Sequence, residues 1–339
     1  MKKFTLLLSA LMIFLLLAAC GQTEEPESAN ETEETETATE TEETEQVAEA
    51  ITISGVLGDV ELEAPAEKVV ALEWTYAEDL LAVGVQPVGM SDIEGYNSWV
   101  QIEEELGSDV VDVGTRQEPS LEKIAELEPD LIIAIKFRHE AIKEELEAIA
   151  PTVFFDPYPT DETISQYDEM ESTFTEVAKA VDKSAEAEQV LADLEQKYEE
   201  AKTTIEASDL ATKDVVLSQA YSANQAPEIR IFTPNSMAAV ILDKIGLNNV
   251  HESEQFEVYG FSTVNVEALP QYEEANFVYV VQDEDNVFEN QLKDNAVWKN
   301  LNFVQEDRMY ALGGDAWLFG GPLSAKVVVD RIVEKMVSN

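Results

Sequence analysis

The chain has 339 residues, of which 70 are acidic and 21 are lysine or arginine, and its formal net charge at pH 7 is −49. Twelve glutamates lie in residues 21–50, and without them and the two lysines at the N-terminus residues 51–339 still carry −39. This charge argues against a nucleic-acid partner and against binding flat on an anionic membrane surface. The 289 residues from Ile51 onward are enough for two lobes.

The N-terminus has the pattern of an exported protein. A basic start is followed by the apolar run Phe4–Ala19 and by Cys20, the only cysteine of the chain. Residues 1–19 are too short to span a membrane comfortably and predict a signal peptide. The segment around Cys20 resembles a bacterial lipobox, which implies cleavage before Cys20 and a diacyl anchor on its sulfur. The alternative is an ordinary signal peptide with an incidental cysteine. Residues 20–50 have one sign of charge and few apolar side chains, which predicts a disordered acidic tether.

Residues 51–160 predict the first α/β lobe. The alternation in residues 51–64 indicates a β-hairpin, and short apolar runs indicate buried strands at 69–72, 87–90, 110–113, 131–135 and 152–155. A helix is expected after the first of these strands, ending near Gly84, and another over residues 120–128. Strands joined by such crossovers pair in parallel, so we expect a Rossmann-like lobe.

Two arginines follow neighbouring strands of this lobe. Arg116 comes shortly after the strand at 110–113, and Arg138 comes shortly after the strand at 131–135. Parallel strands send their carboxyl ends to one edge of the sheet, which is where ligands bind in open α/β sheets. The chain has only five arginines, so two at one edge predict a binding site for an anionic group.

Residues 161–210 predict one long connecting helix, because residues 163–208 contain no Gly or Pro and are rich in good helix formers. Such a helix between two lobes would limit how far they hinge. Residues 211–339 predict a second α/β lobe that repeats the strand and helix pattern of the first, a weak sign of internal duplication. The fold class predicted is therefore α/β, with two Rossmann-like lobes joined by one long helix.

Four segments carry a resemblance to a known family. They are EKVVALEWTYAEDLLAVGVQPVG, GTRQEPSLEKIAELEPDLIIA, IRIFTPNSMAAVILDKIGL and WLFGGPLSAKVVVDRI. In this order they resemble the siderophore-binding lipoproteins of Gram-positive iron-uptake ABC transporters, and most of all the ferric-citrate and citrate-hydroxamate binders. The resemblance covers essentially everything after the tether. It implies a class III periplasmic-binding-protein-like fold, lipid-anchored to the outer face of the cell membrane, that captures a ferric siderophore between its lobes and delivers it to ABC permease subunits.

The resemblance also implies site residues. Arg230, in the second lobe, would face Arg116 and Arg138 across a cleft. Aromatic side chains would form an apolar wall around the chelate, with Trp74 and Trp317 preferred and with Tyr76, Trp99, Tyr221 and Phe319 as further candidates. His139, next to Arg138, is a candidate pocket residue. The alternatives are surface ion pairs for the arginines and core packing for the aromatic residues. Arg308 and Arg331 are expected at the surface.

Two glutamates are candidates for docking to the transporter. Glu122 and Glu267 each lie in the first turn of a predicted helix, and in the family one glutamate per lobe at these positions meets arginines of the membrane subunits. The simpler interpretation is that each carboxylate offsets a helix dipole.

Enzyme and metal-site motifs are missing from the sequence. His139 and His251 are the only histidines, neither belongs to HExxH, and they fall short of the ligand set of a bare zinc or manganese site. There is no GxSxG or P-loop, and Ser120 is better explained as a helix cap than as an SxxK nucleophile. We therefore expect a monomeric binding protein with no cofactor, whose iron is held by the siderophore. The rivals are a haem or corrinoid binder of the same fold, a surface hydrolase and an adhesive lipoprotein.

Overall fold

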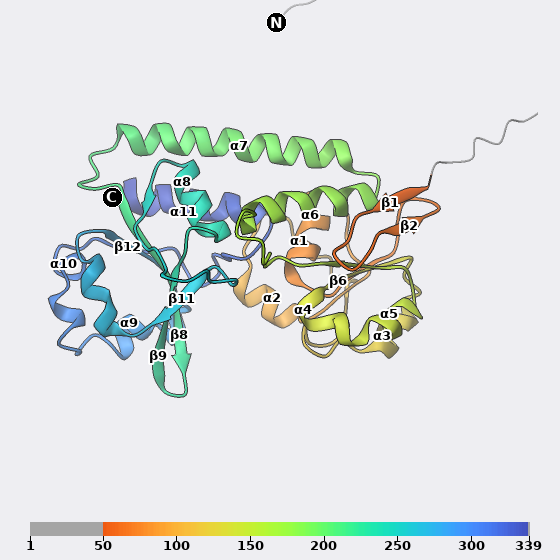
Figure 1. The fold of residues 1–339 in the computed structure, drawn as a ribbon, viewed down its shortest axis with the longest axis horizontal. Helices are drawn as coiled ribbons and strands as arrows, with labels where there is room; N and C mark the ends of the chain where they lie inside the picture. The colour runs from red at the N-terminus through yellow and green to blue at the C-terminus, as the bar shows by residue number, and fades with distance from the viewer. Residues whose placement is uncertain (1–49, 338–339) are drawn as a thin grey trace, which may run out of the picture. The chain divides into compact units, whose positions relative to one another are not determined.

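The computed structural model of the protein describes residues 50–337, which begin with a β-hairpin (Figure 1). β1 (Ile51–Ile53) pairs antiparallel with β2 (Val60–Leu62), as the alternation in the sequence predicted. The signal peptide, Cys20 and most of the tether lie outside the described residues. Among the described residues, none of the helices is both long and apolar enough to span a bilayer.

The first lobe is built on a five-stranded parallel sheet in the order β5-β4-β3-β6-β7, which confirms the predicted Rossmann-like arrangement. Its strands are β3 (Val69–Ala71), β4 (Gly89–Met90), β5 (Val111–Asp112), β6 (Leu131–Ile135) and β7 (Thr152–Phe155). Its helices are α1 (Trp74–Ala82), α2 (Ile93–Trp99), α3 (Leu121–Glu126), α4 (Lys136–His139), η1 (Glu140–Ile142) and α5 (Lys143–Glu147).

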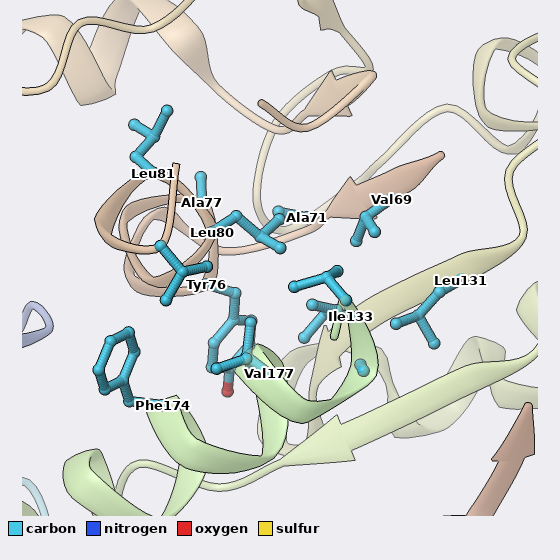
Figure 2. Close-up of a cluster of buried hydrophobic side chains, with 14 of the residues drawn as sticks. Val69, Ala71, Tyr76, Ala77, Leu80, Leu81, Leu131, Ile133, Phe174 and Val177 are labelled. Carbon is cyan, nitrogen blue, oxygen red and sulfur yellow. The ribbon is translucent and has the colours of Figure 1, made fainter. Parts of the chain in front are cut away.

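Both faces of this sheet are buried, which explains the continuous apolar runs of its strands. On one face Val69 and Ile133 pack with Tyr76 of α1 (Figure 2). Phe174 and Val177 of α6 (Gln166–Ala180) pack on the same face. The alternate residues of the same strands pack on the other face, with side chains of α3 and α5. The carboxyl ends of the strands are left free to carry functional side chains.

The second lobe has a mixed sheet in the order β11-β9-β8-β12-β13, with β10 beside β8. Its strands are β8 (Asp214–Ala223), β9 (Ala226–Phe232), β10 (Asn248–Asn249), β11 (Phe261–Val264), β12 (Asn276–Val280) and β13 (Met309–Ala311). Its helices are α8 (Met237–Lys244), η2 (Val266–Tyr272), η3 (Asp283–Asp285), α9 (Val287–Asn290), η4 (Trp298–Asn300), α10 (Asn302–Gln305) and α11 (Pro322–Val337). β9 runs antiparallel to β8 and β11, so this lobe does not repeat the first strand for strand.

The connecting segment consists of two helices, α6 (Gln166–Ala180) and α7 (Ser184–Ala207), so the prediction of one continuous helix is wrong at Val181–Lys183. α7 still runs along both lobes (Figure 1). Its first part joins the core of the first lobe through Ala187, and its later part joins the core of the second lobe through Leu194 and Tyr198. α6 and α11 also contribute side chains to both cores. Three helices therefore tie the lobes together.

Candidate functional site

Two arginines and one glutamate meet at the carboxyl edge of the first sheet. Arg116 follows β5, Arg138 lies in α4 directly after β6, and Glu73 lies between β3 and α1. Nη1 of Arg116 donates to Oε1 of Glu73 at 2.7 Å, and Nε of Arg138 donates to Oε2 at 3.0 Å. The prediction that the arginines lie at the same edge is confirmed. Both are paired with a carboxylate that the sequence reasoning did not single out.

The surroundings of Arg116 fix its guanidinium from several sides. Its Cζ lies 3.5 Å from the centroid of a ring of Trp74, and its Nε lies 3.5 Å from Oδ2 of Asp92. A planar cation stacked on an indole face gains electrostatic attraction in addition to its ion pairs. Only 17% of the Arg116 side chain is exposed, so the group is held in one place before any ligand arrives.

Arg230 lies on β9 of the second lobe, where the neighbouring strand β8 supplies its partners. Its Nη1 donates to Oε1 of Gln219 at 3.1 Å, and its Nη2 donates to the Tyr221 hydroxyl at 2.9 Å. The nearest carboxylate, Glu228, is 3.9 Å from Nε. Because it pairs with neutral groups at hydrogen-bond distance, Arg230 is less neutralised than Arg116.

Residues from both lobes line one cavity of about 410 Å³, a volume suited to a small-molecule ligand. We call this cavity the crevice. It is lined by Trp74, Trp99, Arg116, Gln219, Tyr221, Ser222, Arg230, Asp285 and Trp317. The Trp317 ring lies 5.1 Å from Trp74 and 6.2 Å from Trp99, both in edge-to-face contact, so three indoles form an aromatic wall. Arg138 is not among the lining residues and joins the crevice only through Glu73.

Besides Arg138, three candidate ligand residues do not line the crevice, namely Tyr76, His139 and Phe319. Tyr76 points into the core of the first lobe, where it contacts Phe155 edge to face and is 1% exposed (Figure 2). Tyr76 lies two residues after Trp74 in α1, which places its side chain on nearly the opposite side of the helix from the crevice wall. His139 is fully buried and does not line the crevice.

His139 instead holds the backbone behind Arg116. Its Nδ1 accepts from the amide of Ile135 at 3.2 Å, which leaves the proton on Nε2, and Nε2 donates to the carbonyl of Arg116 at 2.8 Å. Burial lowers the pKa of His139, so the neutral ring is favoured. The histidine therefore fixes the loop that carries Arg116.

The remaining charged candidates have different surroundings. Glu122 and Glu267 are exposed in the first turns of α3 and η2, as predicted for docking or dipole roles. Arg308 and Arg331 are less exposed than expected, at 12% and 19%, because they donate to backbone carbonyls of the second lobe. No group of three or more His, Cys, Asp or Glu side chains within residues 50–337 could hold a metal ion.

Sequence reasoning missed four polar residues of the site. Gln219, Ser222 and Asp285 line the crevice, and Glu73 pairs with both arginines. Glu73 had a usable signal, because it directly follows a predicted strand at the same sheet edge as the arginines. Asp285 had none, because its place depends on its bond from the amide of Ser222, 63 residues away.

Comparisons with known proteins place the chain among related sequences. A family model described as periplasmic binding protein matches residues 69–316. The probable siderophore-binding lipoprotein YfiY of Bacillus subtilis is 29% identical over 335 residues, which cover 96% of this chain and 94% of YfiY. The Fe(3+)-citrate-binding protein YfmC of the same organism is 28% identical and covers 82% of this chain and 84% of its own length.

A solved structure gives the same fold. The siderophore-binding protein FhuD of Vibrio cholerae, bound to Fe3+–Desferal, superposes with a TM-score of 0.70 and 28% identity, over 80% of this chain and 97% of that one. The predicted fold class and the resemblance to siderophore-binding lipoproteins are therefore confirmed.

Proposed function

Because the chain belongs to the periplasmic binding protein family, we propose that it captures a ferric siderophore in the crevice and delivers it to the permease subunits of an ABC transporter. The observation that carries this proposal is that arginines from both lobes and three indoles line one cavity. The names of the relatives support it, since one is a probable siderophore-binding lipoprotein and another binds Fe(3+)-citrate. Such a protein makes and breaks no bond in its ligand.

Each part of the crevice has a distinct role in this proposal. Arg116 and Arg230 donate hydrogen bonds to the carboxylate or hydroxamate oxygens on the outside of the chelate, while the siderophore's own oxygens hold Fe(III). The indoles of Trp74, Trp99 and Trp317 cover the apolar surface of the ligand and exclude water. Tyr221 and Gln219, which also line the crevice, orient Arg230 through hydrogen bonds.

The lipid anchor, the tether and the two docking glutamates predicted from the sequence would connect ligand capture to transport. A diacyl anchor on Cys20 would keep the monomer on the outer face of the cell membrane, and the acidic tether would let the folded part reach the transporter. Glu122 and Glu267 would dock to basic residues of the permease subunits. The names of two relatives as lipoproteins support the anchor.

Tryptophan quenching of the mature protein tests the proposal. Ferric citrate, a ferric citrate-hydroxamate, ferrioxamine B, a ferric catecholate, haem and cobalamin are titrated separately. We expect saturable quenching by a ferric siderophore without turnover, with ferric citrate or a citrate-hydroxamate as the preferred ligand. Tight binding of haem or cobalamin alone would favour the rival ligands, and chemical conversion of a ligand would favour an enzyme.

Arg230→Ala provides the residue-level test. We expect it to weaken binding by about 1.5–3 kcal/mol, or roughly 10- to 160-fold, because it removes hydrogen bonds from a charged donor. Lys213→Ala is the matched control, since Lys213 directly precedes β8 at the end of that strand away from Tyr221. Equal affinities of Arg230→Ala and the wild type would remove Arg230 from the site.

A further inference from the structure

Glu73 binds two guanidinium groups with one carboxylate, and nothing in the sequence resemblance gives it a role. We propose that Glu73 is a positioning residue that holds the guanidinium of Arg116 in the orientation that it presents to the crevice, with Arg138 as the second cation that anchors the carboxylate. This inference rests on the proposed function, because it concerns the same crevice. For the affinity of a Glu73 variant toward an anionic ligand, this role predicts the opposite of what a simple count of charges predicts.

The charges explain why a shared carboxylate is needed. The side chains of Arg116 and Arg138 are only 17% and 21% exposed, and two cations this close repel each other. The Glu73 side chain is 8% exposed and lies between them. Removing the partner of a buried charge leaves that charge uncompensated, so the arginines would be expected to turn away toward water or other acids.

The geometry shows what the carboxylate fixes. Each oxygen of Glu73 takes one arginine, Oε1 from Nη1 of Arg116 and Oε2 from Nε of Arg138. Within residues 50–337 these two arginines make no other side-chain hydrogen bonds. Nε of Arg116 is buried and lies 3.5 Å from Oδ2 of Asp92. The part of the Arg116 fork that Glu73 and Asp92 leave unpaired is therefore available to ligand oxygens in the crevice, in a direction that the bond to Glu73 helps to fix.

The backbone fixes Glu73 itself. It is the N-cap of α1, and its Oε1 also accepts from the amide of Trp74 at 3.3 Å. Trp74 in turn stacks on Arg116 and begins the aromatic wall. One junction between β3 and α1 therefore places both the acceptor for the arginines and the indole that covers one of them.

Glu73→Gln tests the positioning role, because the amide is uncharged and replaces one of the two acceptor oxygens with an NH2 donor, which cannot accept from the second guanidinium group. The change makes the crevice more positive by one charge. A charge count alone predicts tighter binding of anionic ferric citrate and weaker binding of cationic ferrioxamine B. The positioning role predicts about a tenfold or larger loss for whichever complex the wild type binds, ferric citrate included.

A double-mutant cycle separates positioning from general destabilisation. In an Arg116→Ala/Arg138→Ala background, Glu73→Gln should have little further effect on affinity, because no arginine remains to be positioned. Glu73→Asp is the second variant, since it keeps the charge and the helix cap but withdraws the carboxylate by one methylene, and it should also weaken binding. Glu176→Gln is the matched control, because Glu176 is a paired glutamate on α6 outside the crevice.

The outcomes are distinct. Unchanged or tighter binding of ferric citrate by folded Glu73→Gln would overturn the inference and leave the proposed function standing. An additive loss in the double-arginine background would also overturn it. Failure of the wild type to bind any ferric complex would instead refute the proposed function, and the inference with it.

Discussion

Glu169 of α6 lies in a small cavity with Asp79 and Tyr76, at the junction of the two lobes. Burial raises the pKa of Glu169 to about 8, while a hydrogen bond from Thr173 opposes the shift. Burial also raises the pKa of Asp79 well above its usual range. The protonated form of Glu169 is therefore favoured in the folded protein at neutral pH.

The raised pKa of Glu169 predicts that stability falls as the pH rises from about 4.5 to about 8. The unfolded chain releases this proton near pH 4.5 and the folded chain near pH 8, so the free energy of unfolding should fall as the pH rises between these values. The fall from Glu169 is on the order of 4 kcal/mol. Urea unfolding of Glu169→Gln at pH 5 and pH 8.5 should show a smaller fall than the wild type. An equal fall in both proteins would contradict the assignment.

The break between α6 and α7 shows what element-level reasoning missed. Asp182 has a φ of 55°, the amide of Lys183 donates to the carbonyl of Ala178, and the amide of Asp182 donates to that of Lys179. This is a Schellman motif with aspartate where glycine is usual. A helix end without Gly or Pro has no clear signal in the sequence. The turn between β8 and β9 likewise uses left-handed backbone without glycine, since Asn224 and Gln225 both take positive φ values.

Glu122 in the first turn of α3 and Glu267 in the first turn of η2 are the residues predicted to dock to the permease subunits. Glu122→Ala/Glu267→Ala should reduce siderophore-dependent iron uptake by cells at least ~10-fold while the soluble protein keeps its affinity, because the lost contacts belong to the permease interface. Glu126→Ala/Glu289→Ala, at two other exposed glutamates, is the matched control. Normal uptake with the first pair would leave these residues with helix-dipole roles alone.

At the scale of the whole molecule, α6, α7 and α11 join the two lobes, because each helix contributes buried side chains to both cores. Sliding or opening the lobes would have to separate packed side chains of all three helices. We therefore expect the lobes to move little when a ligand binds. The formal charge of −39 on the folded part adds self-repulsion across this compact arrangement.

Salt should stabilise the folded protein. The Debye length falls from about 30 Å at 0.01 M to about 3 Å at 1 M ionic strength, so added NaCl screens repulsion among the surface carboxylates. The melting temperature of the mature protein should therefore rise between 0.01 M and 1 M NaCl. A constant or falling melting temperature would show that the acidic surface does not limit stability.

The sequence alone determined the α/β class, the parallel first sheet and the placement of Arg116 and Arg138 at one edge, because strand periodicity and crossover length are local properties of the chain. The family resemblance also indicated Trp74, Trp317 and Arg230, and the predicted strand ends indicated Tyr221; all four line the crevice with Arg116. Only the tertiary structure decided that Glu73 pairs with both arginines, that Tyr76 and His139 face inward, and that Asp285 reaches the crevice. Those facts depend on helix phase and on contacts between residues far apart in the chain, which no local pattern encodes.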